Sequence, residues 1–371
     1  MGKGWLKSLV AGVAITLLAG PAFADTIKLG VPGAHSGDLA SYGLPTVNAA
    51  KIVAKLYNEK GGILGMQVEV LPQDDQCKPE LATNAATKLV SDKATVVLGH
   101  ICSGATKAAL PIYKEANIVV MSPSATTPAL TQSKEYPIFF RTIASDDQQA
   151  KLGVSYAIDK LGLKKIAVLH DKGDYGKGYA EFAKTFIEES GKAEVVLFEG
   201  VTPGAMDYSA VVQKLRRSKA DGVMYGGYHP EASKLVSQMR KKRMDMPFIA
   251  ADGVKDDTFI KVAGENAEGV YATSSKDVSK LPMYQEAIAH HKAEFGTDPG
   301  AFYKEAYAAA TALLNAVEKA GSTDSDKIKE ALRNNYAETP IGSIKFDSIG
   351  DAEGIGFSMY QVQNGQYVEL Q

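Results

Sequence analysis

Residues 95–131, TVVLGHICSGATKAALPIYKEANIVVMSPSATTPALT, decide the fold. The apolar run Thr95–Gly99 suits a short strand buried on both faces, and a helical pattern follows it from Ser103 to about Glu115. The run Ile118–Met121 repeats the strand pattern, and the turn-rich segment Ser122–Pro128 should start another short helix. Strand, helix and strand in this order predict a parallel sheet covered by helices.

Small hydroxyl residues follow both of these strands. In an open parallel sheet, ligands bind beyond the carboxyl ends of the strands, where helix N-termini present unpaired N–H groups. We therefore expect Ser103 and Thr126 to hold a carboxylate. The alternative is that both hydroxyls only cap helices, which is the usual role of Ser and Thr before a helix.

The start of the 371-residue chain is typical of a secretory signal peptide. Lys3 and Lys7 precede the apolar run Leu9–Leu18, and Ala22-Phe23-Ala24 offers a small-residue cleavage site. No later apolar run approaches the ~20 residues that span a bilayer, and no cysteine lies near the cleavage site for a lipid anchor. We expect residues 1–24 to be removed and the mature protein to be soluble in an exported compartment.

Length and charge narrow the class of protein further. A chain of this length predicts two domains, because single cores stop growing beyond ~250–300 residues. The 41 basic and 43 acidic residues nearly balance and form no basic block. This composition does not indicate a basic surface that would bind nucleic acid or an anionic membrane.

The chain has two cysteines, Cys77 and Cys102. In an oxidising compartment they should form a disulfide, and the alternative is two separate buried thiols. Because Cys102 adjoins Ser103, the disulfide would also hold the proposed binding turn in place.

Strand-like and helical segments alternate along the rest of the chain, and they predict two Rossmann-like halves in succession. The expected strands outside the opening stretch are 26–30, 67–71, 165–170, 194–198, 222–226, 247–250, 270–273, 344–346, 356–362 and 367–370. The expected helices are 46–60, 79–92, 175–190, 209–219, 231–242, 282–295, 302–320 and 325–334. No Pro- or Ser-rich linker separates the halves, so we expect strands that cross between them.

Motifs for enzymes and cofactors do not fit. Pro32 occupies the place of a required glycine in the first turn, 30–37, which argues against a dinucleotide site. The chain carries no phosphate-binding loop, no nucleophile elbow and no zinc-ligand spacing, and His290-His291 most simply lies on a solvated helix face. We expect no cofactor, no metal and no catalytic residues.

Three residues of the second half also follow predicted strands, namely Tyr175, Tyr228 and Asp252. Taken singly, Asp252 would be a turn or cap residue and the tyrosines would be rim aromatics. As a set they face the hydroxyl clusters of the first half. Hydroxyls on one side and a carboxylate with aromatic rings on the other could hold a small zwitterion.

Taken together, these segments resemble the type I periplasmic binding proteins of branched-chain amino acid ABC transporters, specifically the leucine/isoleucine/valine-binding proteins. The resemblance covers essentially the whole mature chain. The segments that carry it are Ser41-Tyr42-Gly43, Asp74-Asp75 with Cys77, Gly99–Ser103, Pro123–Thr126, His170–Lys172 with Tyr175-Gly176, and Tyr225–Glu231.

The resemblance implies a role for each candidate site residue. Ser103 and Thr126, with a main-chain N–H near Ala125, would bind the ligand carboxylate. The Ser124 carbonyl and the Thr126 hydroxyl would help to hold the ammonium group, and Tyr175 would contact the ligand from the second lobe. The residues that would surround the ligand side chain are Tyr42, Ile101, Tyr228 and Phe302. Cys77 and Cys102 match the family's disulfide.

The sequence departs from the family at one site position. The family's usual ammonium-binding residue is a glutamate, and the matching residue here is Asp252, which keeps the charge but is one methylene shorter. The lobes could close further, a water could bridge the gap, or the preferred ligand could differ.

The resemblance implies two lobes, made of residues 25–143 plus about 275–352 and of residues 144–274 plus about 353–371. It implies a monomeric periplasmic binding protein, not an enzyme, that captures an amino acid, branched-chain or a related aliphatic one, and delivers it to an inner-membrane ABC permease. Two alternatives stay open: ligand sensing for a signalling receptor, and binding of another small carboxylate such as an aromatic acid.

Overall fold

The computed structural model of the protein describes Met1 and residues 26–370. The predicted signal peptide therefore falls outside the described residues except for Met1. Among the helices that the structure describes, none is long and apolar enough to cross a membrane.

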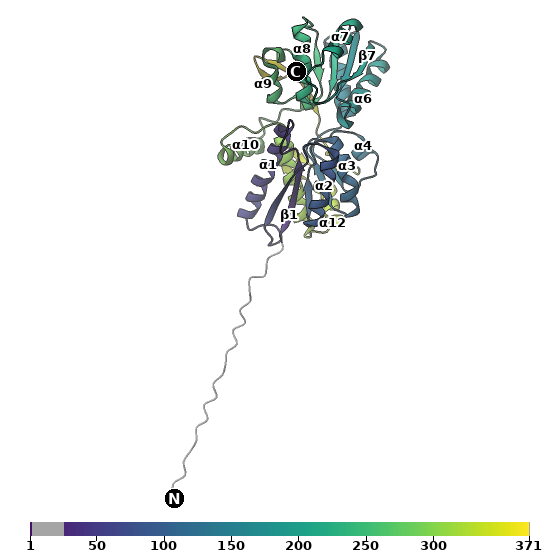
Figure 1. The fold of residues 1–371 in the computed structure, drawn as a ribbon. Helices are drawn as coiled ribbons and strands as arrows, with labels where there is room; N and C mark the ends of the chain where they lie inside the picture. The colour runs from purple at the N-terminus through teal and green to yellow at the C-terminus, as the bar shows by residue number, and fades with distance from the viewer. Residues whose placement is uncertain (2–25, 371) are drawn as a thin grey trace.

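The described chain contains two large sheets, and helices pack around each of them to form two bodies (Figure 1). The first sheet has the strand order β2-β1-β3-β4-β5, and all its neighbouring strands run parallel. Its strands are β1 (Ile27–Gly33), β2 (Val68–Asp74), β3 (Val96–Leu98), β4 (Val119–Ser122) and β5 (Phe139–Arg141). The helices between them are α1 (Ala40–Glu59), α2 (Pro79–Ser91), α3 (Ser103–Glu115) and α4 (Ala129–Gln132).

The second sheet has the order β14-β13-β10-β9-β8-β6-β7. Its strands are β6 (Lys165–His170), β7 (Glu194–Gly200), β8 (Gly222–Gly226), β9 (Phe248–Ala250), β10 (Tyr271–Ser275), β13 (Phe357–Gln363) and β14 (Gln366–Glu369). The helices of this part are α5 (Asp146–Ser155), continued by a π-helical turn (Tyr156–Lys160), α6 (Asp174–Ser190), α7 (Ser209–Ser218), α8 (His229–Lys241) and α9 (Asp257–Ala263), with 3-10 turns at Asp252–Val254 and Gly264–Ala267.

The predicted α/β class with helix-covered parallel sheets is confirmed, with one correction. In the second sheet β6 to β10 run parallel, but β13 pairs antiparallel with both β10 and β14. The reason is local, because β13 and β14 are joined by Asn364-Gly365, whose φ angles of 52° and 73° suit a tight two-residue hairpin turn. The sequence analysis identified both strands without their direction.

Alternating side chains of the central strands bury both faces of each sheet. In β3, Val96 and Leu98 pack in the core that contains residues of α1 and α11 (Tyr303–Ala320), whereas Val97 packs in the core with residues of α2 and α3. In β6, Ile166 and Leu169 likewise belong to cores on opposite faces. Each such side chain contributes roughly 1.5–3 kcal/mol on burial, which explains the continuous apolar runs in the sequence.

The chain returns to the first sheet after β10. The segment that returns contains α10 (Pro282–Phe295), α11, α12 (Ser325–Asn334) and the small hairpin of β11 (Ala337–Thr339) and β12 (Gly342–Ile344). Helix α11 packs against α1 and β3, and α12 packs against α11 and β4, in the body that contains β1 (Figure 1). The C-terminus lies in the other body.

Three local differences from the sequence analysis concern the site. Helix α1 begins at Ala40 and not at Thr46, with Pro45 inside it, and α1 therefore carries Tyr42. Strand β5 and helix α5 were missed altogether. All three differences change what lies near the carboxyl ends of the strands.

A disulfide joins Cys77 to Cys102, as expected, and their Cα atoms are 5.4 Å apart. Cys102 is the N-cap residue of α3, directly before Ser103, and Cys77 precedes α2. The disulfide therefore ties the start of α3 to the loop after β2.

We expect the double substitution Cys77→Ser and Cys102→Ser to lower the free energy of unfolding by about 3–4 kcal/mol, since the loop it opens spans 25 residues. Chemical denaturation of the oxidised protein and of the variant measures this difference. Thiol titration of unreduced, denatured protein should detect no free thiol. Two reactive thiols per chain, or an unchanged denaturation midpoint, would contradict the prediction.

Candidate functional site

The carboxyl ends of strands from both sheets meet around one narrow cavity with an empty volume of about 230 Å³. Seven of the ten ligand-binding residues expected from the sequence line it, together with Gly253. The lining residues are Tyr42, Ile101, Ser124, Tyr175, Tyr228, Asp252, Gly253 and Phe302. The fold thus brings together residues from four distant parts of the chain.

The other three expected residues, Ser103, Ala125 and Thr126, are buried directly beside this lining. Ser103 Oγ accepts a hydrogen bond from the N–H of Thr127 at 3.3 Å, so the start of α3 contacts the turn after β4. The Thr126 hydroxyl is fully buried and has no hydrogen-bond partner among the described residues. These hydroxyls form the polar end of the site.

The structure argues against the alternative that Ser103 and Thr126 only cap helices. Ser103 is the first residue of α3, and Cys102 occupies the N-cap position without a side-chain cap. Pro128 occupies the N-cap position of α4, so Thr126 lies outside that helix. Neither hydroxyl satisfies a helix N-terminus, which leaves both available for a ligand.

The sequence analysis missed the part played by Ser122 in this turn. Its hydroxyl donates to the carbonyl of His100 at 2.6 Å and accepts the N–H of Ala125 at 2.9 Å. The main-chain donor expected near Ala125 is therefore engaged within the protein. The N–H of Thr126, one residue on, has no acceptor among the described residues.

Aromatic rings form one wall of the cavity. The ring centroid of Tyr42 lies 6.0 Å from that of Tyr228 and 5.6 Å from that of Phe302, and the centroids of Tyr175 and Tyr228 are 5.1 Å apart. Ile101 adds an aliphatic surface. This wall offers apolar contact to a ligand and few groups that could bond a polar side chain.

Tyr175 and Asp252 form the polar floor that the second sheet contributes. The Tyr175 hydroxyl donates to Asp252 Oδ1 at 2.6 Å and accepts the N–H of Gly253 at 2.9 Å. Asp252 is 2% exposed, and its second oxygen, Oδ2, has no hydrogen-bond partner among the described residues. One carboxylate oxygen is thus held in place by Tyr175, and the other is unbonded, with the amide of the buried Gln149 nearby.

Burial raises the pKa of Asp252 to about 6, although the hydrogen bond from Tyr175 acts in the opposite direction. The carboxyl therefore ionises near neutral pH. A positively charged group placed at Oδ2 would favour its ionised form.

Asp146 is a further buried carboxyl that the sequence analysis did not identify. It is the first residue of α5, and burial, followed by the charge of Asp252, raises its pKa well above the usual range. A usable signal was present, because Ser145 followed three residues later by Gln148 matches a helix N-terminal pattern. Its helix was missed, and Asp146 with it.

Contacts between the two bodies enclose the cavity. The Tyr42 hydroxyl, from α1, donates to the carbonyl of Gly253 at 2.5 Å, and Ser41 Oγ lies 3.2 Å from His229 Nε2. Lys107 on α3 makes an ion pair of 2.7 Å with Asp174 on α6. A ligand held here would touch both bodies at once.

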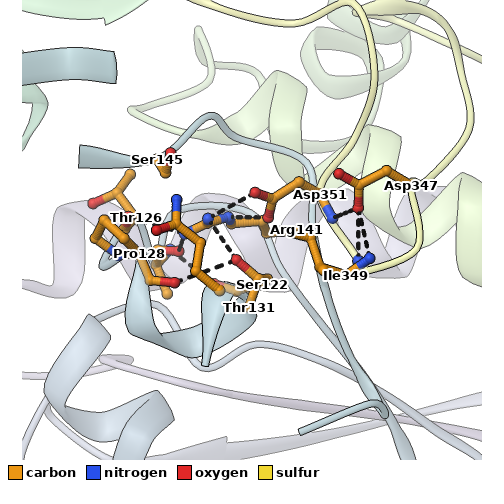
Figure 2. Close-up of polar contacts among 12 residues, drawn as sticks. Ser122, Thr126, Pro128, Thr131, Arg141, Ser145, Asp347, Ile349 and Asp351 are labelled. Carbon is orange, nitrogen blue, oxygen red and sulfur yellow. Dashed lines mark hydrogen bonds and ion pairs between the residues drawn. The ribbon is translucent and has the colours of Figure 1, made fainter. Parts of the chain in front are cut away.

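Arg141, at the end of β5, organises the turn that carries the hydroxyls (Figure 2). Its guanidinium donates to both carboxylate oxygens of Asp351, at 2.6 and 3.0 Å. It also donates to the Thr126 carbonyl at 2.9 Å, to the Thr127 carbonyl at 3.1 Å and to Thr131 Oγ1 at 2.8 Å. The carbonyls of Thr126 and Thr127 therefore point toward Arg141 and away from the cavity.

A second, larger groove of about 1800 Å³ lies beside α1 and the start of α11, and it shares only Phe302 with the cavity. Charges of both signs line it, including Lys255 and Asp256. It contains neither the hydroxyl turn nor Asp252, so the small cavity is the better candidate site. Among the described residues, no cluster of three His, Cys, Asp or Glu side chains is placed to hold a metal ion.

Comparison with known proteins identifies a matching family and similar proteins. A family model described as periplasmic binding protein matches residues 26–366. A leucine-, isoleucine-, valine-, threonine- and alanine-binding protein of Pseudomonas aeruginosa is 36% identical over 357 residues, which is 96% of this chain and 95% of that protein.

Two solved structures are similar over 93% of this chain. The branched-chain amino acid transporter substrate binding protein of Streptococcus pneumoniae, in complex with isoleucine, is 30% identical with a TM-score of 0.83 and is covered over its full length. A solute binding protein of an ABC transporter from Rhodopseudomonas palustris, in complex with 3,4-dihydroxy benzoic acid, is 26% identical with a TM-score of 0.79 and is covered over 96%.

We expect Tyr175→Phe to raise the pKa of Asp252 above its value of about 6, because the lost hydroxyl donates to the charged form of that carboxyl. A carbon-13 NMR titration of the Asp252 carboxyl measures the shift. Tyr179→Phe is the matched control, because the buried Tyr179 hydroxyl has no hydrogen-bond partner among the described residues. An unchanged or lower pKa in Tyr175→Phe would contradict the assignment.

Proposed function

The chain belongs to the periplasmic binding protein family, and on this premise we propose that it captures an amino acid between its two halves and delivers it to an ABC permease. The family is one of binding proteins and not of enzymes, in agreement with the expectation from the sequence. The ligand that we propose is an α-amino acid with a branched or related aliphatic side chain.

The observation that carries the proposal is the available oxygen of Asp252. A buried carboxylate without a counter-charge is costly, and an ammonium group at Oδ2 would compensate its charge. The hydrogen bond from Tyr175 holds the carboxylate in position to receive it. An ammonium group therefore fits this end of the cavity better than a neutral group.

The ligand carboxylate would bind at the hydroxyl turn. Ser103 supplies a hydroxyl, and the N–H of Thr126, which has no acceptor among the described residues, supplies a main-chain donor beside the start of α3. The partial positive charge at the N-terminus of α3 favours an anion there. The Ser124 carbonyl accepts no hydrogen bond among the described residues, so it could take one N–H of the ammonium group.

The apolar wall supports an aliphatic side chain. Tyr42, Tyr228, Phe302 and Ile101 offer contact without a charged group. The similar proteins of Pseudomonas aeruginosa and Streptococcus pneumoniae bind leucine, isoleucine or both, as their names state. We infer the same class of ligand for this chain.

A second candidate ligand is an aromatic acid. The aromatic rings of the wall and the likeness to the Rhodopseudomonas palustris protein that holds 3,4-dihydroxy benzoic acid favour it. Such an acid brings no positive charge, so Asp252 would have to stay protonated or unpaired. The charge of Asp252 therefore separates the two candidates.

The proposal extends to the whole protein. Residues 25–143 plus about 275–352 would form one lobe, and residues 144–274 plus about 353–371 the other. The ligand would favour the arrangement in which both lobes contact it. We propose that the mature protein acts as an unanchored monomer in the periplasm.

We expect Asp252→Asn to lower the affinity for L-leucine by roughly 10²–10³-fold, since the ammonium group would be buried without its counter-charge. Titration calorimetry with L-leucine and with 4-methylpentanoate, which lacks the ammonium group, measures the effect. The affinity for 4-methylpentanoate should fall much less. Asp257→Asn removes an exposed carboxylate of the same segment and should change neither affinity.

Equal losses for both ligands would mean that Asp252 supports the fold and does not recognise the ammonium group. Tighter binding of benzoate than of any aliphatic amino acid by the wild-type protein would favour the second candidate.

We expect Ser103→Ala to weaken both ligands alike, by roughly ten- to a hundredfold, because both carry the carboxylate that its hydroxyl would bind. The melting temperature of the ligand-free variant should stay close to that of the wild type, since Ser103 caps no helix. Unchanged affinity would contradict this role.

A further inference from the structure

The second buried carboxyl, Asp146, lies directly behind the hydroxyl turn. It is fully buried, and its N–H donates to the Thr126 carbonyl at 3.0 Å. Neither of its carboxylate oxygens has a hydrogen-bond partner of normal geometry among the described residues. An ionisable group in this state needs a specific explanation.

Thr126 lies next to Asp146, because the hydrogen bond from the Asp146 N–H to the Thr126 carbonyl joins the two residues. The Thr126 side chain lowers the pKa of Asp146, whereas burial has a larger effect and raises it. The Thr126 hydroxyl oxygen is buried without a partner. A hydroxyl has one proton to donate and two lone pairs to accept with. Once that proton points toward Asp146, the oxygen can only accept from the cavity side.

The charges around Asp146 do not compensate it. Arg141, on β5, favours its ionised form but is already paired with Asp351. The neighbouring Asp147 and, across the cavity floor, Asp252 are both acidic. The groups that face the two carboxyls from α6 and α11 are Tyr175, Tyr179 and Glu305. Among the described residues, no cation that lacks a partner of its own compensates the charge of Asp146 and Asp252.

We propose that Asp146 is a positioning residue for the ligand's ammonium group: it accepts a hydrogen bond from the Thr126 hydroxyl, so that Thr126 Oγ1 accepts an N–H from an ammonium group whose other side faces Asp252. This inference rests on the proposed function. It gives the ammonium group two buried carboxylates, one in direct contact and one acting through Thr126. The second carboxylate offsets the shorter reach of Asp252.

The pH dependence of binding follows from the same arrangement. Burial raises the pKa of Asp146 and of Asp252, so both carboxyls hold protons at low pH. A protonated Asp146 cannot orient Thr126 as an acceptor, and a protonated Asp252 carries no charge. Amino-acid affinity should therefore be fully present above these pKa values and should fall as the pH drops through them.

The test is Asp146→Asn, which keeps the shape and removes the charge. We expect the affinity for L-leucine to fall roughly ten- to a hundredfold and that for 4-methylpentanoate to fall no more than about twofold. Asp147→Asn is the matched control, since that partly exposed carboxylate is the next residue of α5, and it should change neither affinity.

A double-mutant cycle isolates the route through Thr126. In a Thr126→Val background, Asp146→Asn should cause almost no further loss of L-leucine affinity. A full additional loss would overturn the relay. Equal losses for the two ligands in Asp146→Asn, with a lowered melting temperature, would also overturn it, because they indicate a structural role.

The wild-type protein supplies a measurement that does not depend on how the variants fold. Calorimetry of L-leucine binding, in two buffers with different ionisation enthalpies and over a series of pH values, should show proton release with the pH dependence of two carboxyls, because the ammonium group favours the ionised form of both. Release that follows the ionisation of a single carboxyl over the whole series would contradict a role for Asp146. If the wild-type protein binds no amino acid but does bind benzoate, the proposed function fails and this inference fails with it.

Discussion

The buried guanidinium of Arg141 is the interaction on which the binding turn depends. A buried cation is tolerated only when its hydrogen-bonding groups are satisfied, and Arg141 satisfies them with Asp351, 210 residues away, and with main-chain carbonyls of residues 126 and 127. Because these carbonyls point toward Arg141, the opposite side of the turn presents hydroxyls and an N–H. The returning segment that carries Asp351 is therefore needed to shape a site formed by the first third of the chain.

The site also divides its chemistry between the two sheets. The first sheet supplies neutral donors, namely hydroxyls and helix N-termini, whereas the second supplies Asp252 and the tyrosine that fixes it. Each half alone offers only part of what a zwitterion requires. The direct contact between the Tyr42 hydroxyl and the Gly253 carbonyl brings the two parts together.

Much of this arrangement could be predicted from the sequence, because it follows local rules. Apolar runs such as Val96–Leu98 identify the central strands, and positions just beyond strand ends identified Tyr175, Tyr228 and Asp252. The other expected lining residues, Tyr42, Ile101, Ser124 and Phe302, were implied by the family resemblance. Long-range partners could not be predicted in this way. Nothing near Arg141 in the sequence indicates Asp351, and β5 has only three residues, too few for a periodic pattern. Asp146 was missed because the apolar positions of its helix are interrupted by polar residues.

The ion pair between Lys107 and Asp174 has a practical consequence. Both side chains are well exposed, they project from α3 and α6, and neither lines the cavity. Any movement that opens this edge of the molecule must separate these two groups. A donor and an acceptor dye attached at these positions would therefore report the separation optically while leaving every ligand contact intact, which makes this edge of the molecule a natural place to build a fluorescent sensor for the ligand.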